Sequence, residues 1–133
     1  MKDKKMSHRL NKGVLIVFEG IDGGGKTTQA RLLYGKLKQA NFPVEISKEP
    51  TEGKWGKKLK ELIKQGKNRI MPQDELEMFI RDRHQHIKKV VNPALKNKKI
   101  VILDRYYFSN MAYQGALDIA PQLIEKRNRE FAP

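Results

Sequence analysis

The chain has 133 residues, about the size of one ordinary domain, with 38% hydrophobic and 32% charged residues. No run of about 18 apolar residues occurs, which excludes a membrane-spanning helix, and the absence of cysteine excludes disulfide bonds and thiolate metal sites. Residues 1–13 are basic but lack the apolar stretch of a secretory signal. We therefore expect a cytoplasmic protein with no membrane partner.

The net charge of +13 leaves two classes of protein open. A strongly basic chain is typical of nucleic-acid-binding proteins, because neutralising phosphates releases counterions. Lysine-rich helix faces that are simply solvated give the same charge, and the aromatic residues are not interleaved with the lysines as a base-stacking platform requires. A positive field also favours the binding of nucleotide phosphates to an enzyme.

Short apolar runs rich in β-branched residues predict buried strands over 14–18 and 99–104, and a second short strand is predicted over 44–48. Apolar spacings of three and four predict helices from residue 26 to about 40, over 57–65, from 73 to about 91, and over 121–130. Loops are expected at 49–53 and 66–72. Strands that alternate with helices predict an α/β fold with a parallel sheet covered on both faces. We expect residues 1–12 to be a basic tail, and 13–133 to be the first portion of a single domain.

The segment from Gly20 to Thr27 matches the phosphate-binding P-loop pattern, between a predicted strand and a predicted helix. Its glycines let successive N–H groups converge on phosphate oxygens, and the helix amino end adds a positive dipole. Lys26 can bridge the β- and γ-phosphates, and the Thr27 hydroxyl can bind Mg²⁺. A glycine-rich turn before an ordinary helix explains neither the lysine nor the hydroxyl. The residues expected to contact ATP are Gly20, Ile21, Asp22, Gly23, Gly24, Gly25, Lys26, Thr27 and Thr28.

Two further positions have competing interpretations. Asp22 lies among N–H groups that hold anions, so it either bonds to the local backbone or contacts a hydroxyl of a second substrate. Arg83 lies in line with the apolar stripe that contains Phe79 and Ile80, so it is either buried with a partner or reaches out to solvent. His84 and His86 are expected to be surface or helix-packing residues, because the histidines show no zinc-like spacing.

Two longer segments, 18–29 and 104–115, resemble the signatures of thymidylate kinases. The loop Lys48-Glu49-Pro50 and the pair Phe79 and Arg83 lie between them in the order of that family. The resemblance covers nearly the whole chain from Gly13. It implies a P-loop NTPase fold, three-layer α/β/α, with three of five expected parallel strands present. The chain therefore resembles a partial copy.

The resemblance also implies roles for individual residues. Asp104 would bind magnesium or its bound water, Arg105 would hold the acceptor monophosphate, Phe79 would stack on thymine and Arg83 would hydrogen-bond the base. Catalysis would depend on Lys26, Arg105 and Asp104, and the metal on Thr27 and Asp104. The residues expected to bind the acceptor are Asp22, Lys48, Glu49, Pro50, Phe79, Arg83, Arg105, Ser109, Asn110, Tyr113 and Gln114. An Asp–Arg pair that caps a strand, and a polar loop before a helix, are the competing explanations for the segment 104–115.

Two departures from the family pattern are visible. Lys48 stands where many members have arginine, which keeps the charge but loses the bidentate geometry. Gly23 stands where some members carry a basic residue. Members without that residue resemble the bacterial type, in which an arginine from a lid further along the chain stabilises the transition state. That lid is expected beyond residue 133.

The expected activity is transfer of the ATP γ-phosphate to dTMP, giving dTDP, with Mg²⁺ as cofactor. The resemblance implies a homodimer, and no nucleic-acid partner is expected. A related nucleotide or deoxynucleoside kinase with another acceptor remains an alternative. So does a nucleic-acid-binding or regulatory P-loop protein, as well as a chain that is inactive because it lacks the lid.

Overall fold

The computed structural model describes residues 8–20, 24–66, 71–107 and 119–133. Its centre is a parallel sheet of β1 (Val14–Phe18), β2 (Val44–Lys48) and β3 (Ile100–Asp104) in the order β1-β3-β2. Both outer strands pair with β3, so that Ile100 lies opposite Val14 and Val44. All five residues of β3 are buried. This confirms the three predicted strands, two of which are expected from their apolar sequences.

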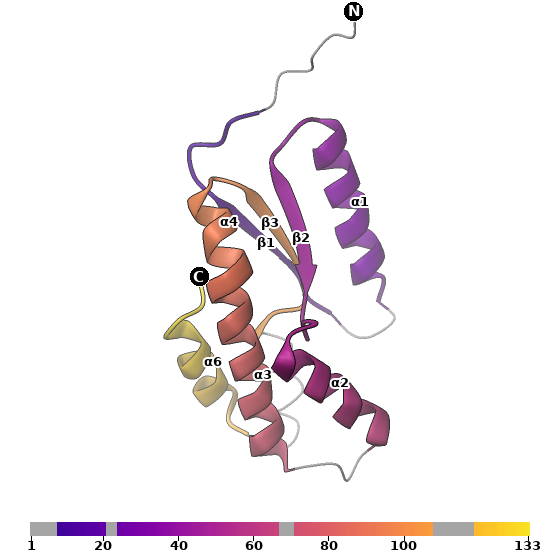
Figure 1. The fold of residues 1–133 in the computed structure, drawn as a ribbon, viewed down its shortest axis with the longest axis vertical. Coiled ribbons are helices and arrows are strands. Elements are labelled where there is room, and N and C mark those ends of the chain that lie inside the picture. The colour runs from indigo at the N-terminus through magenta and orange to yellow at the C-terminus, as the bar shows by residue number, and fades with distance from the viewer. Residues whose placement is uncertain (1–7, 21–23, 67–70, 108–118) are drawn as a thin grey trace, which may run out of the picture.

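Helices cover both faces of the sheet, which confirms the three-layer α/β/α prediction (Figure 1). Even-numbered strand residues such as Ile16 and Ile102 pack against α1 (Lys26–Gln39). Odd-numbered residues such as Leu15 and Val101 pack against η1 (Ile87–Val91) and α4 (Asn92–Lys96). Successive strand residues face opposite sides of the sheet. The position of a residue at the strand end therefore decides whether its side chain faces α1 or faces η1 and α4.

The helix predicted from 73 to about 91 is longer than expected. It consists of α3 (Pro72–His86), η1 and α4, which follow one another without a break to Lys96. Within η1 the Asn92 N–H bonds to the Ile87 carbonyl, five residues back, which is the spacing of a π-helix. Pro93 follows in the first turn of α4, where a missing N–H is tolerated. The proline therefore does not end the helix.

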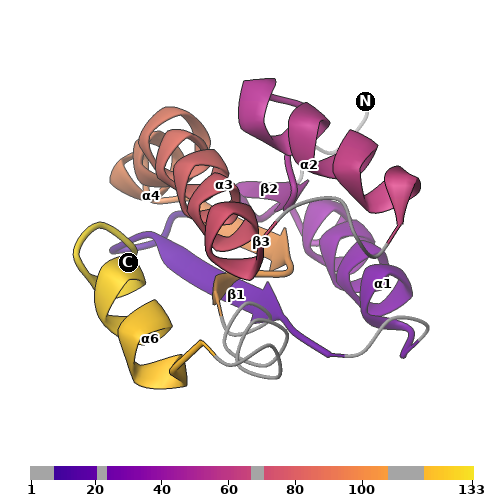
Figure 2. The same cartoon turned by 90° about the horizontal axis from the view of Figure 1, so that it is seen from below.

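Two shorter helices complete the description. α2 (Lys54–Gln65) begins three residues before the predicted start, directly after Gly53, whose backbone is extended. α6 (Pro121–Arg129) ends one residue before the predicted end. Its Ile124 packs against Leu76 and Ile80 of α3. Figure 2 views the molecule from the carboxyl ends of the strands and shows α2, α3, α6 and the start of α1 arranged around them.

Gly56 allows α2 to lie against the loop that precedes it. A Cβ at this position would lie 1.9 Å from the Thr51 carbonyl oxygen, so Gly56→Ala requires the backbone to move. We expect this variant to lower the free energy of unfolding by about 2 kcal/mol, measured by urea denaturation. Gly35→Ala is the matched control, because Gly35 lies in α1 with no atom within 4 Å of the added carbon. The control should raise stability by about 0.5–1 kcal/mol. Equal effects of the two variants would contradict this account.

Candidate functional site

At Gly20 and Gly25, the connection from β1 to α1 has backbone conformations that suit a P-loop. Gly20 has a φ of 155° and Gly25 a φ of 82°, conformations that side chains with a Cβ rarely adopt. Gly25 is the N-cap of α1, and no side chain among the described residues caps the helix. The first turn of α1 also contains no acidic residue. Its amino end is therefore suited to an anion. Ile21, Asp22 and Gly23 lie outside the described residues.

A short hydrogen bond joins the start of α1 to the end of β3. The Thr27 hydroxyl donates to Asp104 Oδ2 at 2.5 Å. Asp104 is buried, and its Oδ1 has no hydrogen-bond partner in the part of the chain that the structure describes. The predicted pair of oxygen ligands therefore comes together across 77 residues of sequence. Two oxygens of this kind, one of them with unused acceptor capacity, fit a hard cation such as Mg²⁺.

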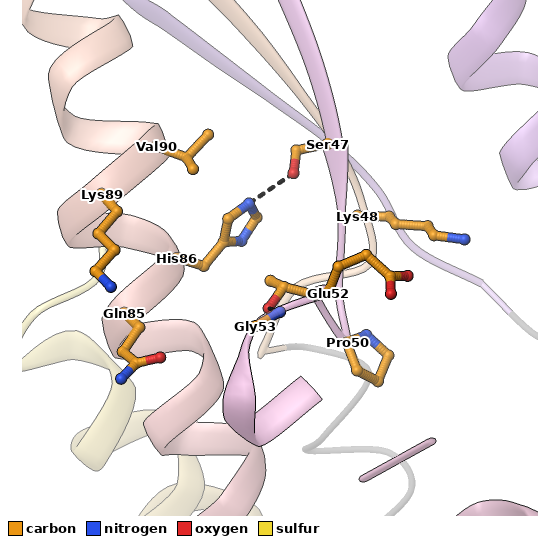
Figure 3. A pocket seen from close by; sticks show the side chains of 10 residues that line it. Ser47, Lys48, Pro50, Glu52, Gly53, Gln85, His86, Lys89 and Val90 are labelled. Carbon is orange, nitrogen blue, oxygen red and sulfur yellow. Dashed lines mark hydrogen bonds between the residues drawn. The ribbon is translucent and has the colours of Figure 1, made fainter. Parts of the chain in front are cut away.

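Lys48 ends β2 opposite Asp104 in the sheet register. Both residues are even-numbered and so belong to the face of the sheet that packs on α1. Figure 3 shows the Lys48 side chain pointing away from His86 of α3. Lys48 is therefore on the same side as the P-loop, where a cation is useful for holding phosphate.

Arg105 follows β3 in the left-handed conformation, with a φ of 74°. A non-glycine residue in this region costs about 1 kcal/mol, and surrounding hydrogen bonds hold it there. The Arg105 N–H donates to the Phe18 carbonyl at 3.0 Å, and the Tyr106 N–H donates to Glu19 Oε1 at 2.5 Å. The turn after β3 is thereby attached to the end of β1. The structure thus brings Arg105 to the same edge as Asp104 and the P-loop.

On the other face of the sheet, Arg83 is buried in a polar network. Its Nε donates to Glu49 Oε1 at 2.7 Å, and its Nη1 donates to Asn128 Oδ1 at 2.7 Å. Only 1% of Arg83 is exposed, so it does not reach out to solvent. The guanidinium also lies 5.4 Å from the centre of the Tyr106 ring. Burial raises the pKa of the Tyr106 phenol, which therefore stays neutral. The expectation that a buried arginine needs a partner is confirmed.

His86 is the fourth member of this network. Its Nδ1 lies 2.9 Å from Glu49 Oε2, and its Nε2 lies 2.7 Å from Ser47 Oγ. His86 is buried, whereas His84 is exposed and meets the edge of Phe131. Sequence reasoning gave His86 no polar role. Its position three residues after Arg83, on the same side of the helix, was the available signal.

Asp82 holds the loop between β2 and α2. Its carboxylate accepts the Thr51 N–H at 2.8 Å and the Thr51 hydroxyl at 2.5 Å. The Thr51 hydroxyl oxygen in turn accepts the Gly53 N–H at 3.0 Å. The Glu49–Pro50 peptide bond in this loop is cis. Because Asp82 neighbours Arg83 in α3, one helical turn fixes both the loop and the Glu49 carboxylate.

The remaining predicted residues are only partly placed. Phe79 is partly buried in α3, one helical turn before Arg83 and on the same side of the helix. Ser109, Asn110, Tyr113 and Gln114 lie outside the described residues. Sequence reasoning missed Ser47, Thr51, Asp82 and Asn128. Asn128 gave no signal, because its contact with Arg83 spans 45 residues.

A pocket of about 430 Å³ lies between β2 with its following loop and α3 (Figure 3). Ser47, Lys48, Pro50 and His86 line it, but no described residue of the P-loop does. Asp104 and Arg105 are also absent from its walls. The pocket thus shares Lys48 with the edge where the phosphate-binding elements meet, but it does not include Asp104, Arg105 or the described residues of the P-loop. We locate the functional site at that edge because its groups have complementary chemistry.

Comparisons with known proteins agree with this geometry. The family model described as "Thymidylate kinase" matches residues 18–133. The thymidylate kinases of Desulfotalea psychrophila and Akkermansia muciniphila are 46% and 47% identical to this chain over 92% of its length. The chain spans only 60% and 58% of those two relatives. The crystal structure of thymidylate kinase from Ehrlichia chaffeensis superposes with a TM-score of 0.82 at 35% identity, covering 92% of this chain and 71% of that one.

The contact between Thr51 and Asp82 predicts a stability effect. Thr51→Val preserves the shape and the backbone N–H but removes the hydroxyl, which leaves buried Asp82 Oδ1 without this donor. We expect the free energy of unfolding to fall by about 2 kcal/mol in urea denaturation. Thr51→Ser keeps the hydroxyl and is the matched control, with an expected loss below about 1 kcal/mol. A valine variant as stable as the serine variant would show that this hydrogen bond does not hold the loop.

Proposed function

Because the chain belongs to the thymidylate kinase family, we propose that it forms the nucleotide-binding part of an enzyme that transfers the γ-phosphate of ATP to dTMP. The products are dTDP and ADP. The observation that carries this proposal is the meeting of the P-loop, Asp104 and Arg105 at one edge of the sheet, with Arg83 buried on its other face. A phosphate donor can therefore be held on one face of the sheet at the carboxyl end of β3, and the base of an acceptor can be held on the other face.

The donor ATP binds at the amino end of α1. Gly20, Gly24 and Gly25 let the backbone approach the phosphates, and the N–H groups of the first helical turn point toward them. Lys26 neutralises charge on the β- and γ-phosphates. Ile21, Asp22, Gly23 and Thr28 belong to the same proposed site.

Thr27 and Asp104 are the proposed ligands of Mg²⁺. Two oxygens from this pair leave the remaining positions of the ion to water and phosphate, as is usual for Mg²⁺ at nucleotide sites. Among the described residues no group of three or more His, Cys, Asp or Glu gathers that would form an all-protein cage. When bound, the ion supplies positive charge to the phosphate oxygens during transfer.

The acceptor binds at the carboxyl ends of the strands, where it can reach residues from both faces of the sheet. Arg105, with its planar fork of N–H donors, holds the monophosphate, and Lys48 adds charge on the same edge. Phe79 stacks on the base. A guanidinium has only donors, so Arg83 suits a base that presents a carbonyl oxygen, as thymine does. The other residues assigned to the acceptor are Asp22, Glu49, Pro50, Ser109, Asn110, Tyr113 and Gln114.

These groups accelerate the reaction by positioning and by charge. Lys26, Arg105 and the metal neutralise phosphate oxygens, and the two sites hold the reacting atoms in line. No general base is required. We further propose a cytoplasmic homodimer without a nucleic-acid or membrane partner. Among the described residues no helix is long and apolar enough to cross a membrane.

Lys26→Ala tests the donor site. The variant should lose at least about tenfold in affinity for ATP, because it removes a charge-assisted contact with phosphate. Isothermal titration with an ATP analogue that is not hydrolysed measures the effect. Lys36→Ala is the matched control, since Lys36 is exposed in the last turn of the same helix. Unchanged affinity in the Lys26 variant would remove the assigned role of the loop.

An acceptor panel tests the reaction itself. ADP release by the full-length protein should be faster with dTMP than with dUMP, AMP, CMP or GMP, because Arg83 and Phe79 select the base. A preference for AMP would overturn thymidylate as acceptor and leave a related nucleotide kinase. Absence of any ADP release, together with salt-dependent binding of DNA or RNA without ATP, would favour the nucleic-acid-binding alternative that the charge of +13 suggests.

A further inference from the structure

The Arg83 guanidinium is held from two sides. Glu49 Oε1 accepts from Nε, Asn128 Oδ1 accepts from Nη1, and the Tyr106 ring lies 5.4 Å away. These contacts use two of the five N–H donors that an arginine carries. The two hydrogen bonds engage Nε and Nη1. The fixed contacts therefore determine where the remaining donors point.

The chemistry of the partners fixes the direction of each hydrogen bond. An ionised Glu49 can only accept, so the proton on the His86 ring lies on Nδ1 and is donated to Oε2. The His86 Nε2 forms a hydrogen bond with the Ser47 hydroxyl at 2.7 Å. Asn128 Nδ2 donates to the Ile124 carbonyl at 2.7 Å, which turns Asn128 Oδ1 toward Arg83. Glu49 and Asn128 are therefore both oriented to accept from Arg83.

His86 controls the plane of the Glu49 carboxylate. With Oε2 bonded to His86 and Oε1 bonded to Arg83, the carboxylate cannot rotate without breaking one of the two contacts. The Glu49 N–H also donates to the Asp104 carbonyl at 3.1 Å. The network is thereby attached to the strand end that carries the proposed metal ligand. All four side chains from Glu49, Arg83, His86 and Asn128 are at most 5% exposed, so water does not compete for these contacts.

We propose that Glu49, His86 and Asn128 are positioning residues that set the selectivity of Arg83 for the acceptor base. They hold the guanidinium so that its remaining N–H donors can donate to a carbonyl oxygen of the acceptor base. An amine at the same position of the base would face these donors without an acceptor. A rigid donor rejects a mismatched group strongly, because the buried polar atoms are then left unpaired. A guanidinium free to rotate would turn away from the amine and discriminate less. This inference rests on the proposed function, since it requires a nucleotide base beside Arg83.

The test compares His86→Leu with His86→Asn. Asparagine supplies an amide N–H in place of Nδ1, whereas leucine supplies no donor to Glu49. Titration calorimetry measures the dissociation constants of dTMP and dCMP, which carry a carbonyl and an amine at the same ring position. The ratio of the dCMP constant to the dTMP constant measures the selectivity for the carbonyl, and it does not depend on the fraction of folded protein. We expect the leucine variant to lower this ratio by about tenfold and the asparagine variant by less than about threefold.

Three controls make the outcome decisive. Affinity for ATP should stay within about twofold in both variants, because His86 does not touch the P-loop. Gln85→Leu, at the neighbouring position of α3, should leave the ratio unchanged. Asn128→Ala removes the second hydrogen bond of Arg83 and should also lower the ratio. If His86→Leu does not fold, the ratio in Asn128→Ala tests the inference. A ratio that stays at the value of the unsubstituted protein in both His86→Leu and Asn128→Ala would overturn the inference. If the unsubstituted protein does not bind dTMP, the proposed function fails first.

Discussion

The carboxylate of Glu49 and the guanidinium of Arg83 lie 2.7 Å apart with their side chains 3% and 2% exposed. The pair joins the residue that follows β2 to the last turn of α3, and its two members are 34 residues apart in sequence. Removing one partner from a buried ion pair leaves an uncompensated charge and typically costs about 3–5 kcal/mol. The position of α3 over the strand ends therefore depends on this contact, and so do the loops that follow β2 and β3.

The alternation of side chains along the strands divides the site into two halves. Lys48 and Asp104 face α1 and the P-loop, while Glu49, one residue further along, faces α3. A single step along the backbone thus separates groups that handle phosphate from groups that surround Arg83. The hydrogen bond between the Glu49 N–H and the Asp104 carbonyl keeps the two halves in register. A shift of the backbone in one half can therefore move the other half through this single hydrogen bond.

Sequence reasoning succeeded where the signal was local and failed where it was not. The strands and the position of Arg83 on the apolar side of its helix follow from short runs and helical spacing. The helix end did not, because the helix continues through η1 and Pro93 lies in the first turn of α4, where a missing N–H is tolerated. Asn128 could not be assigned to Arg83, since two distant helices must first pack before the contact exists. Gly56 gave no sign in the sequence that it contacts the backbone of Thr51.

The long helix buries polar side chains in its first part and apolar side chains in its second part. In α3 the buried residues include Glu75, Asp82, Arg83 and His86, whereas η1 and α4 bury Ile87, Val91 and Ala94. The π-helical turn lies at this change, directly after His86. An extra residue in a turn shifts the helix face, so His86 can face Ser47 and Glu49 while Ile87 and Val91 pack on the sheet. Polar groups in an interior of low dielectric interact strongly but must all be satisfied. The fold therefore places its costly buried polar groups Glu49, Arg83 and His86 beside the carboxyl ends of the strands, where a ligand can use them.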